Sequence, residues 1–387
     1  MNVGFGLKIE NEFLTYKLLF MFIIMQVGLV MGNAPFLRDL YGQFNHTFGF
    51  IIDFGMMCYM FALGVEMDPY VLLKKPSRDV QVAYAGIFTT FIIACLTTSL
   101  IQFFPNQQHV LGYTLTLATL LSSTASPVLT RLITSLNIGK SDIGKLVITA
   151  GMYSDFICSL LLSVGYILMP LDTYCSSFEQ KGRIRRAIVM NTVVLGQALF
   201  TATFAPVFMK WVDNENPEGK PMKGSHLVLS LAFMVMICAS SILYNYNPIL
   251  SAFITGICFP REGRVSKWVI SKINYMLTMI FFPIFFLWMG YAADFRNFHP
   301  GALETWLRLF ISIIIAMVGK VAGTVVSGVI LGFHWPESVA IGLLLATKGH
   351  LHIYMAIKVA SILLISLFTV SNSYMLLSFM CQLKILA

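Results

Sequence analysis

The sequence has little charge: Asp, Glu, Lys and Arg make up 11% of its 387 residues, whereas hydrophobic residues make up 57%. Soluble globular domains carry about 25% charged residues, so this composition excludes a soluble domain. A polar stretch long enough to fold as a separate soluble domain is also missing. Apolar segments long enough to cross a hydrocarbon core of about 30 Å recur along the chain. The sequence therefore predicts an all-α polytopic membrane protein in which residues 1–387 form a single transmembrane domain.

A metal-binding motif and a secretory signal are missing as well. The seven cysteines are scattered and show no metal-ligand spacing. The first ten residues lack the basic region, apolar core and small-residue cleavage site of a signal peptide. The formal net charge is +8, but in a membrane protein the position of each charge matters more than the sum. We therefore expect the lipid bilayer as a partner, and neither a cofactor, a resident metal nor a nucleic acid.

Apolar runs between polar residues predict about twelve membrane spans. The first and the eighth are too short to cross the bilayer upright. The twelve runs lie near residues 18–31, 48–65, 80–104, 111–136, 143–169, 187–209, 227–244, 248–259, 273–291, 309–333, 336–357 and 361–383.

The distribution of Lys and Arg predicts the orientation of these spans. If the chain alternates sides, sixteen of these residues lie on the side of the N-terminus and eight lie on the other side. Cytoplasmic loops carry the excess of Lys and Arg in membrane proteins, so both termini are predicted to be cytoplasmic. On this topology the glycosylation sequon Asn45-His46-Thr47 faces outward.

Two predicted spans are interrupted near their centres. The fourth contains Ser122-Ser123-Thr124-Ala125-Ser126-Pro127, where proline removes a backbone donor and hydroxyl groups can bond freed carbonyls. The eleventh contains Ala346-Thr347-Lys348-Gly349-His350-Leu351-His352, with Gly349 as the flexible point. These spans cross in opposite directions, because they are seven spans apart. The pattern predicts an inverted-repeat transporter whose binding site lies where the broken helices cross. For the fourth span taken alone, the alternative is a proline kink without a ligand.

Asp155 lies in the apolar run 146–169 with no basic residue beside it. A carboxylate at that depth costs roughly 2.5 to 3.5 kcal/mol on insertion scales, so it indicates a functional site. Carbonyl ends of broken helices favour cations, and Asp155 with the hydroxyl of Ser154 would complete a cation site. An intramembrane aspartyl protease is an alternative, because Asp53 is a second carboxylate within a predicted span. We favour a position for Asp53 in an aqueous vestibule or among the headgroups.

Lys320 lies near the middle of the tenth span, and Gly319 and Gly323 beside it would let another helix approach closely. We expect its ammonium group to pair with Asp155 when no ion is bound. The alternative is that Lys320 snorkels or neutralises the backbone of a broken helix. Histidines 350 and 352 either relay protons or satisfy carbonyls freed by the break.

Five runs of the sequence together resemble one family, the plant cation/proton exchangers, which form the plant branch of the monovalent cation:proton antiporter-2 group. The resemblance covers about residues 20–358. The runs are Ala62-Leu63-Gly64-Val65-Glu66-Met67-Asp68-Pro69, Ser123-Thr124-Ala125-Ser126-Pro127-Val128-Leu129, Tyr153-Ser154-Asp155, Gly319-Lys320-Val321-Ala322-Gly323-Thr324 and Ala346-Thr347-Lys348-Gly349-His350.

The resemblance implies a sodium/proton-antiporter-like fold with a moving transport core at about 80–169 and 309–383. It further implies a dimerising scaffold at about 18–65 and 227–291, a linking span at about 187–209, and a homodimer in the plasma membrane or an endomembrane. The implied function is potassium transport and pH homeostasis by antiport, without enzymatic catalysis. The implied site comprises the ion-binding residues Asp155, Ser154, Thr124 and Ser126, the charge-compensating residues Lys320 and Lys348, and the helix breaks at Ala125, Pro127, Thr347 and Gly349.

We expect K⁺, or Na⁺, to compete with a proton at Asp155 while the protein alternates its access. The preceding position is aspartate in electrogenic bacterial relatives and Ser154 here, so one carboxylate remains and electroneutral exchange is predicted. The first transmembrane helix and the large cytosolic C-terminal region of the family are not found in this sequence, and the match decays after Lys358. An alternative is therefore a truncated, transport-inactive member that associates with full-length relatives.

Overall fold

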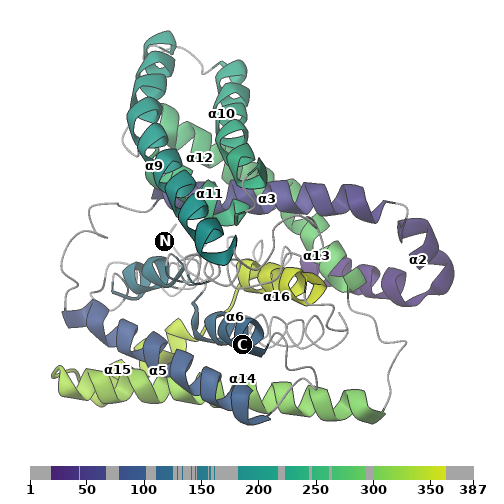
Figure 1. The fold of residues 1–387 in the computed structure, drawn as a ribbon, viewed down its shortest axis with the longest axis vertical. Coiled ribbons are helices and arrows are strands. Elements are labelled where there is room, and N and C mark those ends of the chain that lie inside the picture. The colour runs from purple at the N-terminus through teal and green to yellow at the C-terminus, as the bar shows by residue number, and fades with distance from the viewer. Residues whose placement is uncertain are drawn as a thin grey trace, which may run out of the picture. The chain divides into compact units, whose positions relative to one another are not determined.

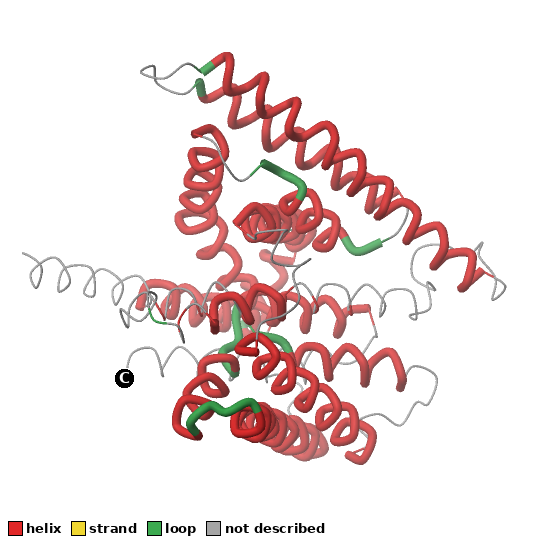
Figure 2. Tube along the Cα trace, turned by 90° about the vertical axis from the view of Figure 1, so that its left-hand side faces the viewer, coloured by secondary structure: helices red, strands yellow, loops and turns green. Residues whose placement is uncertain are grey.

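A computed structural model describes residues 19–42, 44–66, 78–101, 110–124, 182–216, 223–243, 246–260, 264–292 and 300–362, together with short pieces between 129 and 161. Every regular element in these residues is a helix (Figures 1 and 2). The predicted all-α class is therefore confirmed for the described part of the chain. Within it, four helices are long and apolar enough to cross a membrane, namely Thr47–Glu66, Ile188–Glu215, Arg264–Ala292 and Ile313–Ile330.

The chain divides into two compact units. The first comprises residues 1–52, 78–154 and 279–387, and the second comprises residues 53–77 and 155–278. Both sequence interruptions, in the fourth and the eleventh predicted spans, fall in the first unit. This unit therefore contains the crossing that the sequence predicts.

In the first unit, α5 (Arg78–Ile101) packs against α6 (Val110–Ser122) and against the long helix α14 (Pro300–Ile330) (Figure 1). Helix α14 also contacts α15 (Trp335–Leu345), and α6 contacts α16 (His350–Ile362). The unit further contains the helix Leu19–Asn33, α2 (Pro35–Gly42), the beginning of α3 (Asn45–Glu66) and α13 (Phe282–Ala292).

Small residues let α5 and α14 lie close together. A Cβ atom added at Gly319 would lie 2.7 Å from Cδ1 of Ile93, and one added at Gly323 would lie 2.8 Å from Cβ of Thr89. Side chains of one helix thus occupy the space above the glycines of the other, and small residues of this kind are typical of contacts between membrane helices. The close packing expected beside Lys320 is confirmed, and it leaves 1% of the Lys320 surface exposed.

In the second unit, α9 contacts the three helices that follow it, and α10 also contacts α11. Between α9 and α10, the rings of Phe208 and Phe233 stack with their centroids 5.0 Å apart. Aromatic side chains of this size contribute strongly to the packing of two helices. The helices of this unit are α9 (Gly182–Glu215), α10 (Gly224–Leu243), α11 (Pro248–Ile257) and α12 (Arg264–Met276), together with the end of α3.

Helix α11 is the eighth predicted span, and its ten residues agree with the expectation that this span is short. Asn247 caps it, because its side-chain oxygen accepts the N–H of Ile249 at 3.0 Å. Gly256 of α11 lies against Gly64 of α3, and a Cβ atom on either would clash with the backbone of the other helix.

Helix α2 lies outside the predicted apolar runs, and α12 lies mostly before the ninth of them. Helix α2 carries Arg38, and α12 begins with Arg264 and places Val265, Val269 and Ile273 on its buried side. A reading by apolar runs stops at charged residues, so it misses helices with one polar face. A π-helical turn, Leu277–Phe281, joins α12 to α13.

The C-terminal spans differ from the prediction in their bounds. Helix α14 begins at Pro300, well before the predicted position 309. The eleventh span is divided into α15 and α16, and α16 continues to Ile362. The twelfth predicted span, 361–383, lies almost entirely outside the described residues, and the fifth is described as a continuous helix at residues 146–155.

Candidate functional site

Helix α6 ends in the middle of the fourth predicted span. Ser122 is its last residue, and Ser123 and Thr124 continue in a non-helical conformation. The hydroxyl of Ser122 donates to the Thr119 carbonyl and that of Ser123 donates to the Leu120 carbonyl, both at 3.1 Å. Hydroxyl groups thus bind carbonyls of the last turn. The helix interruption is confirmed; Ala125, Ser126 and Pro127 lie outside the described residues.

The second interruption separates α15 from α16. Helix α15 ends at Leu345, and the N–H of Ala346 still bonds to the carbonyl of Gly342 at 3.1 Å. Thr347, Lys348 and Gly349 are not helical, and α16 begins at the next residue. The break predicted around Gly349 is therefore confirmed. Thr347 is half-buried and Gly349 is buried, so the break lies inside the protein.

Thr124 connects the two interruptions. Its hydroxyl donates to the carbonyl of Leu345, the last residue of α15, at 2.7 Å. Its backbone N–H donates to the hydroxyl oxygen of Ser154 at 2.8 Å. The Thr124 hydroxyl also accepts a hydrogen bond from Nζ of Lys320 at 2.7 Å. One buried threonine therefore joins the broken ends of α6 and α15 to a serine and to a buried ammonium group.

Two lysines bind the carbonyl end of α6. Lys320 Nζ donates to the carbonyls of Ser122 at 2.7 Å and Ser123 at 3.1 Å. Lys348 Nζ donates to the carbonyls of Leu120 and Leu121, both at 2.8 Å, and to that of Ser123 at 2.6 Å. One of these side chains comes from α14, and the other comes from the second break itself. Both lysines are buried.

The electrostatic reason for this arrangement is the charge of a helix end. The C-terminal end of a helix carries about half a negative elementary charge, located on carbonyls without intrahelical partners. An ammonium group has three donors, and each of these lysines has three acceptors within hydrogen-bonding distance. Hydrogen bonds to charged groups contribute about 1.5 to 3 kcal/mol each, which offsets the cost of burying the charge. Lys320 thus neutralises the backbone of a broken helix, which was the alternative considered for it.

Ser154 and Asp155 are buried, each with 1% of its surface exposed, at the end of the helical segment 146–155. Ser154 is the last residue of its part of the first unit, and Asp155 begins a part of the second. The structure brings Ser154 to Thr124, whereas the pairing of Asp155 with Lys320 remains a prediction. Among the described residues, Asp155 is the one acidic side chain that is buried. Asp53, the other aspartate within a predicted span, is half-buried on α3.

The two histidines of the second break contact aromatic rings and a backbone amide. His350 stacks on the ring of Phe282 with their centroids 4.5 Å apart, and Phe285 and Phe286 contact its ring edge-on. His352 is fully buried, and its Nδ1 accepts the N–H of Gly349 at 3.4 Å. Nδ1 of His352 thus accepts from a backbone amide at the break rather than donating to a carbonyl.

Sequence reasoning missed the groups that Lys348 binds. The acceptors from Leu120 and Leu121 are backbone carbonyls, so their side chains give no signal of this role. The contact of Phe282 with His350 was missed because it joins distant parts of the sequence. The one available signal was the break after Ser122, which exposes carbonyls that need donors.

Comparison with known proteins identifies relatives of this chain. The family described as "Sodium/hydrogen exchanger, transmembrane" matches residues 11–383. The chain is 45% identical over 334 residues to cation/H(+) antiporter 28 of Arabidopsis thaliana, which covers 85% of this chain and 41% of that protein. It is 25% identical over 313 residues to K(+)/H(+) antiporter 1 of Saccharomyces cerevisiae, covering 77% of this chain and 34% of that protein. The chain thus spans about two fifths or less of the length of these relatives.

A solved structure has a similar fold. The sodium proton antiporter MjNhaP1 from Methanocaldococcus jannaschii aligns with a TM-score of 0.63, covering 95% of this chain and 89% of that chain. Its sequence is 11% identical, so the likeness concerns the fold. These relatives are named as antiporters and not as proteases. With the family match over residues 11–383 and the two broken helices, the chain belongs to the sodium/hydrogen exchanger family and, within it, to the plant cation/proton exchangers.

Proposed function

We propose that this chain exchanges a monovalent cation for a proton and that the two ions compete for Asp155. The preferred cation in this proposal is K⁺. The observation that carries the proposal is the burial of this carboxylate, with 1% of its surface exposed. A buried carboxylate in a membrane requires a counter-charge or a proton. The cation and the proton both supply such a positive charge, so they compete for Asp155, and binding of one releases the other.

The charges at the crossing support a carboxylate as the cation ligand. Lys320 and Lys348 already neutralise the carbonyl end of α6, so this helix end adds little negative charge for an incoming ion. Two ammonium groups without a carboxylate would repel a cation. The hydroxyl oxygen of Ser154 accepts one hydrogen bond and keeps a second lone pair, which suits a hard cation.

Alternating access follows from the two broken helices. Half-helices that meet at the middle of a membrane form the binding site of inverted-repeat transporters, whose repeats rock against each other. The moving core comprises about 80–169 and 309–383, and the scaffold at about 18–65 and 227–291 pairs with a second copy. The name of the yeast relative supports K⁺ as the cation. The mass of the purified protein in detergent tests the pairing, with a mass of two chains expected.

The test of this proposal uses purified protein in lipid vesicles with an imposed pH gradient. Addition of K⁺ or Na⁺ outside should collapse the gradient with native protein and leave it intact with Asp155→Asn. The matched control is Asp53→Asn, which changes a half-buried aspartate on α3 and should retain exchange. Equally fast collapse with native protein and with Asp155→Asn would refute Asp155 as the shared site.

Other outcomes of the same experiment separate the alternatives. Loss of activity in both aspartate variants, together with cleavage of a membrane peptide by native protein, would favour an aspartyl protease. Native protein without flux that co-purifies with a full-length relative would favour a transport-inactive member. The membrane in which the protein resides, plasma membrane or endomembrane, is tested by imaging a tagged chain.

A further inference from the structure

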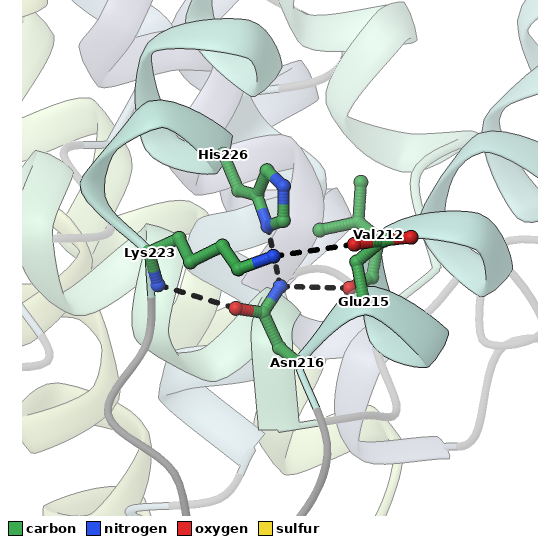
Figure 3. Close-up of polar contacts among 5 residues, drawn as sticks. All are labelled: Val212, Glu215, Asn216, Lys223 and His226. Atoms are coloured by element: carbon green, nitrogen blue, oxygen red, sulfur yellow. Dashed lines mark hydrogen bonds and ion pairs between the residues drawn. The ribbon is translucent and has the colours of Figure 1, made fainter.

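The turn between α9 and α10 contains a buried polar cluster in the second unit (Figure 3). Asn216 follows the last residue of α9, and His226 lies in the first turn of α10. The two residues have 6% and 8% of their surfaces exposed. A buried polar group is destabilising unless its hydrogen bonds are made. The hydrogen bonds of this pair therefore stabilise the contact between the end of α9 and the start of α10.

The hydrogen bonds of Asn216 fix the proton on His226. The Nδ2 group of Asn216 donates to the Val212 carbonyl at 2.8 Å and lies 2.5 Å from Nδ1 of His226, while its Oδ1 accepts the backbone N–H of Lys223 at 3.2 Å. Rotating the amide would place an oxygen against the Val212 carbonyl and a donor against the N–H of Lys223. Nδ1 of His226 is therefore the acceptor, and a neutral ring carries its proton on Nε2.

We propose that Asn216 and His226 form a pH-sensitive latch that holds the end of α9 to the start of α10 while the imidazole is neutral. Uptake of a proton from water at Nδ1 leaves the Nε2 proton in place, so the imidazolium has two N–H donors. The new N–H then faces the N–H of Asn216, and the bond between them is lost. Asn216 can offer its oxygen to the ring only by giving up its bonds to Val212 and Lys223.

The hydrogen-bond geometry determines the sign of the response, because a proton on Nδ1 of His226 removes the acceptor that Asn216 uses. Glu215, the last residue of α9, forms an ion pair with Lys223 at 3.2 Å (Figure 3). The latch is therefore closed at neutral and alkaline pH and opens as the pH falls. The other charged groups near this end of α9 are Lys210 and Asp213. Helix α12, which packs on α9, carries Arg264, Lys267 and Lys272, and Glu218 and Lys220 of the connecting segment lie outside the described residues.

Trp211 provides a direct reporter of this protonation. Its ring centroid lies 5.9 Å from that of His226, with an angle of 55° between the planes. An imidazolium quenches indole fluorescence more strongly than neutral imidazole does. The experiment is an acid titration of the full chain in detergent, from about pH 8 to about pH 5, the range in which histidines take up protons. Native protein should show a sigmoidal loss of fluorescence.

The matched variant is His226→Asn, whose Oδ1 replaces Nδ1 as the acceptor from Asn216 but takes up no proton. Four other tryptophans contribute to the signal, so the difference between native protein and this variant isolates Trp211. The sigmoidal loss should disappear in His226→Asn. Identical titrations of the two proteins would overturn the proposal.

A second variant tests the contact between the two side chains. Asn216→Asp replaces the amide donor with a carboxylate, which accepts a hydrogen bond from the imidazolium and favours it. The fluorescence transition should therefore move to higher pH. An unchanged transition, or one at lower pH, would show that residue 216 does not face His226.

Hydrogen exchange measures the opening of the latch itself. When only the open turn binds the proton, the ratio of open to closed molecules rises by up to about tenfold for each unit by which the pH falls. Amide exchange in the peptide covering Val212 to His226, corrected for the intrinsic effect of pH, should accelerate accordingly in native protein and stay constant in His226→Asn. Constant exchange in both would refute the opening. None of these readouts depends on ion transport, so their failure is separate from failure of the proposed exchange.

Discussion

At the scale of single residues, the site depends on donors that reach the broken end of α6. Lys320 and Lys348 supply charge to that end, while Thr124 joins it to α15 and to Ser154. Thr124 differs from the lysines because its hydroxyl acts in both directions, donating to Leu345 and accepting from Lys320. A hydroxyl is the smallest side-chain group that does both, so few residue types can replace it.

Substitution of Thr124 tests this double role. Thr124→Val keeps the shape of the side chain but leaves the Leu345 carbonyl without this donor and Lys320 without this acceptor. An unmade hydrogen bond of a buried group costs about 1 to 3 kcal/mol, so we expect a loss of that size in the free energy of unfolding. Thr124→Ser retains the hydroxyl and should cost less. Thermal unfolding of the purified variants measures the difference, and equal midpoints for Val and Ser would contradict the role of the hydroxyl.

At the scale of helices, close packing depends on glycine where two backbones meet. Helices α3 and α11 approach each other at Gly64 and Gly256, where backbone atoms of one helix occupy the place of a Cβ on the other. A Cβ atom at Gly64 would lie 3.0 Å from the Gly256 Cα atom and would clash with the Phe253 carbonyl oxygen. Backbone atoms cannot move aside as a flexible side chain does, so the helices have to separate.

We therefore expect Gly64→Ala to destabilise the protein by roughly 1 to 3 kcal/mol, the usual cost of overpacking. The control is Gly196→Ala on α9, where no atom lies within 4 Å of the added Cβ. Alanine is favoured over glycine within a helix by roughly 0.5 to 1 kcal/mol, so this variant should be slightly stabilised. Unfolding of both variants by heat in detergent provides the measurement. A Gly64→Ala protein as stable as Gly196→Ala would show that the two helices do not pack this closely.

Local sequence signals predicted the helix interruptions because their causes are local. The hydroxyl-rich segment ending at Pro127 and the flexible Gly349 both mark places where helical bonding lapses. The partners of Lys348 could not be predicted in the same way, because they are backbone carbonyls on α6, more than two hundred residues earlier. Helices α2 and α12 were missed for a different reason, since their polar faces interrupt the apolar runs on which the prediction relied.

At the scale of the whole molecule, the number of titrating groups sets the charge that each cycle of the proposed exchange would move. Ser154 stands beside Asp155 where a second carboxylate could stand, so we expect one cation to be exchanged for one proton without net movement of charge. Lys320 donates to three acceptors, and loss of its proton would forfeit charge-assisted bonds at the end of α6. We therefore expect the cycle to use the proton of Asp155 alone.

This reasoning predicts that the rate of exchange in vesicles does not change when a membrane potential is imposed with a permeant anion. Ser154→Asp adds a second carboxylate. The rate should then depend on the potential, because the numbers of protons and cations moved in one cycle are no longer equal. The pH indicator inside the vesicles measures both rates. Exchange by native protein that follows the potential would indicate that a second group, such as Lys320, also releases a proton.

One carbonyl at the end of α6 is shared. The oxygen of Ser123 accepts from Lys320 at 3.1 Å and from Lys348 at 2.6 Å. Removal of either side chain leaves this oxygen with the other donor, so the two residues are partly redundant there. The effects of the two substitutions on the free energy of unfolding are consequently coupled. Removal of both side chains costs more than the sum of the two single removals, because only the double change leaves the Ser123 oxygen without a lysine donor.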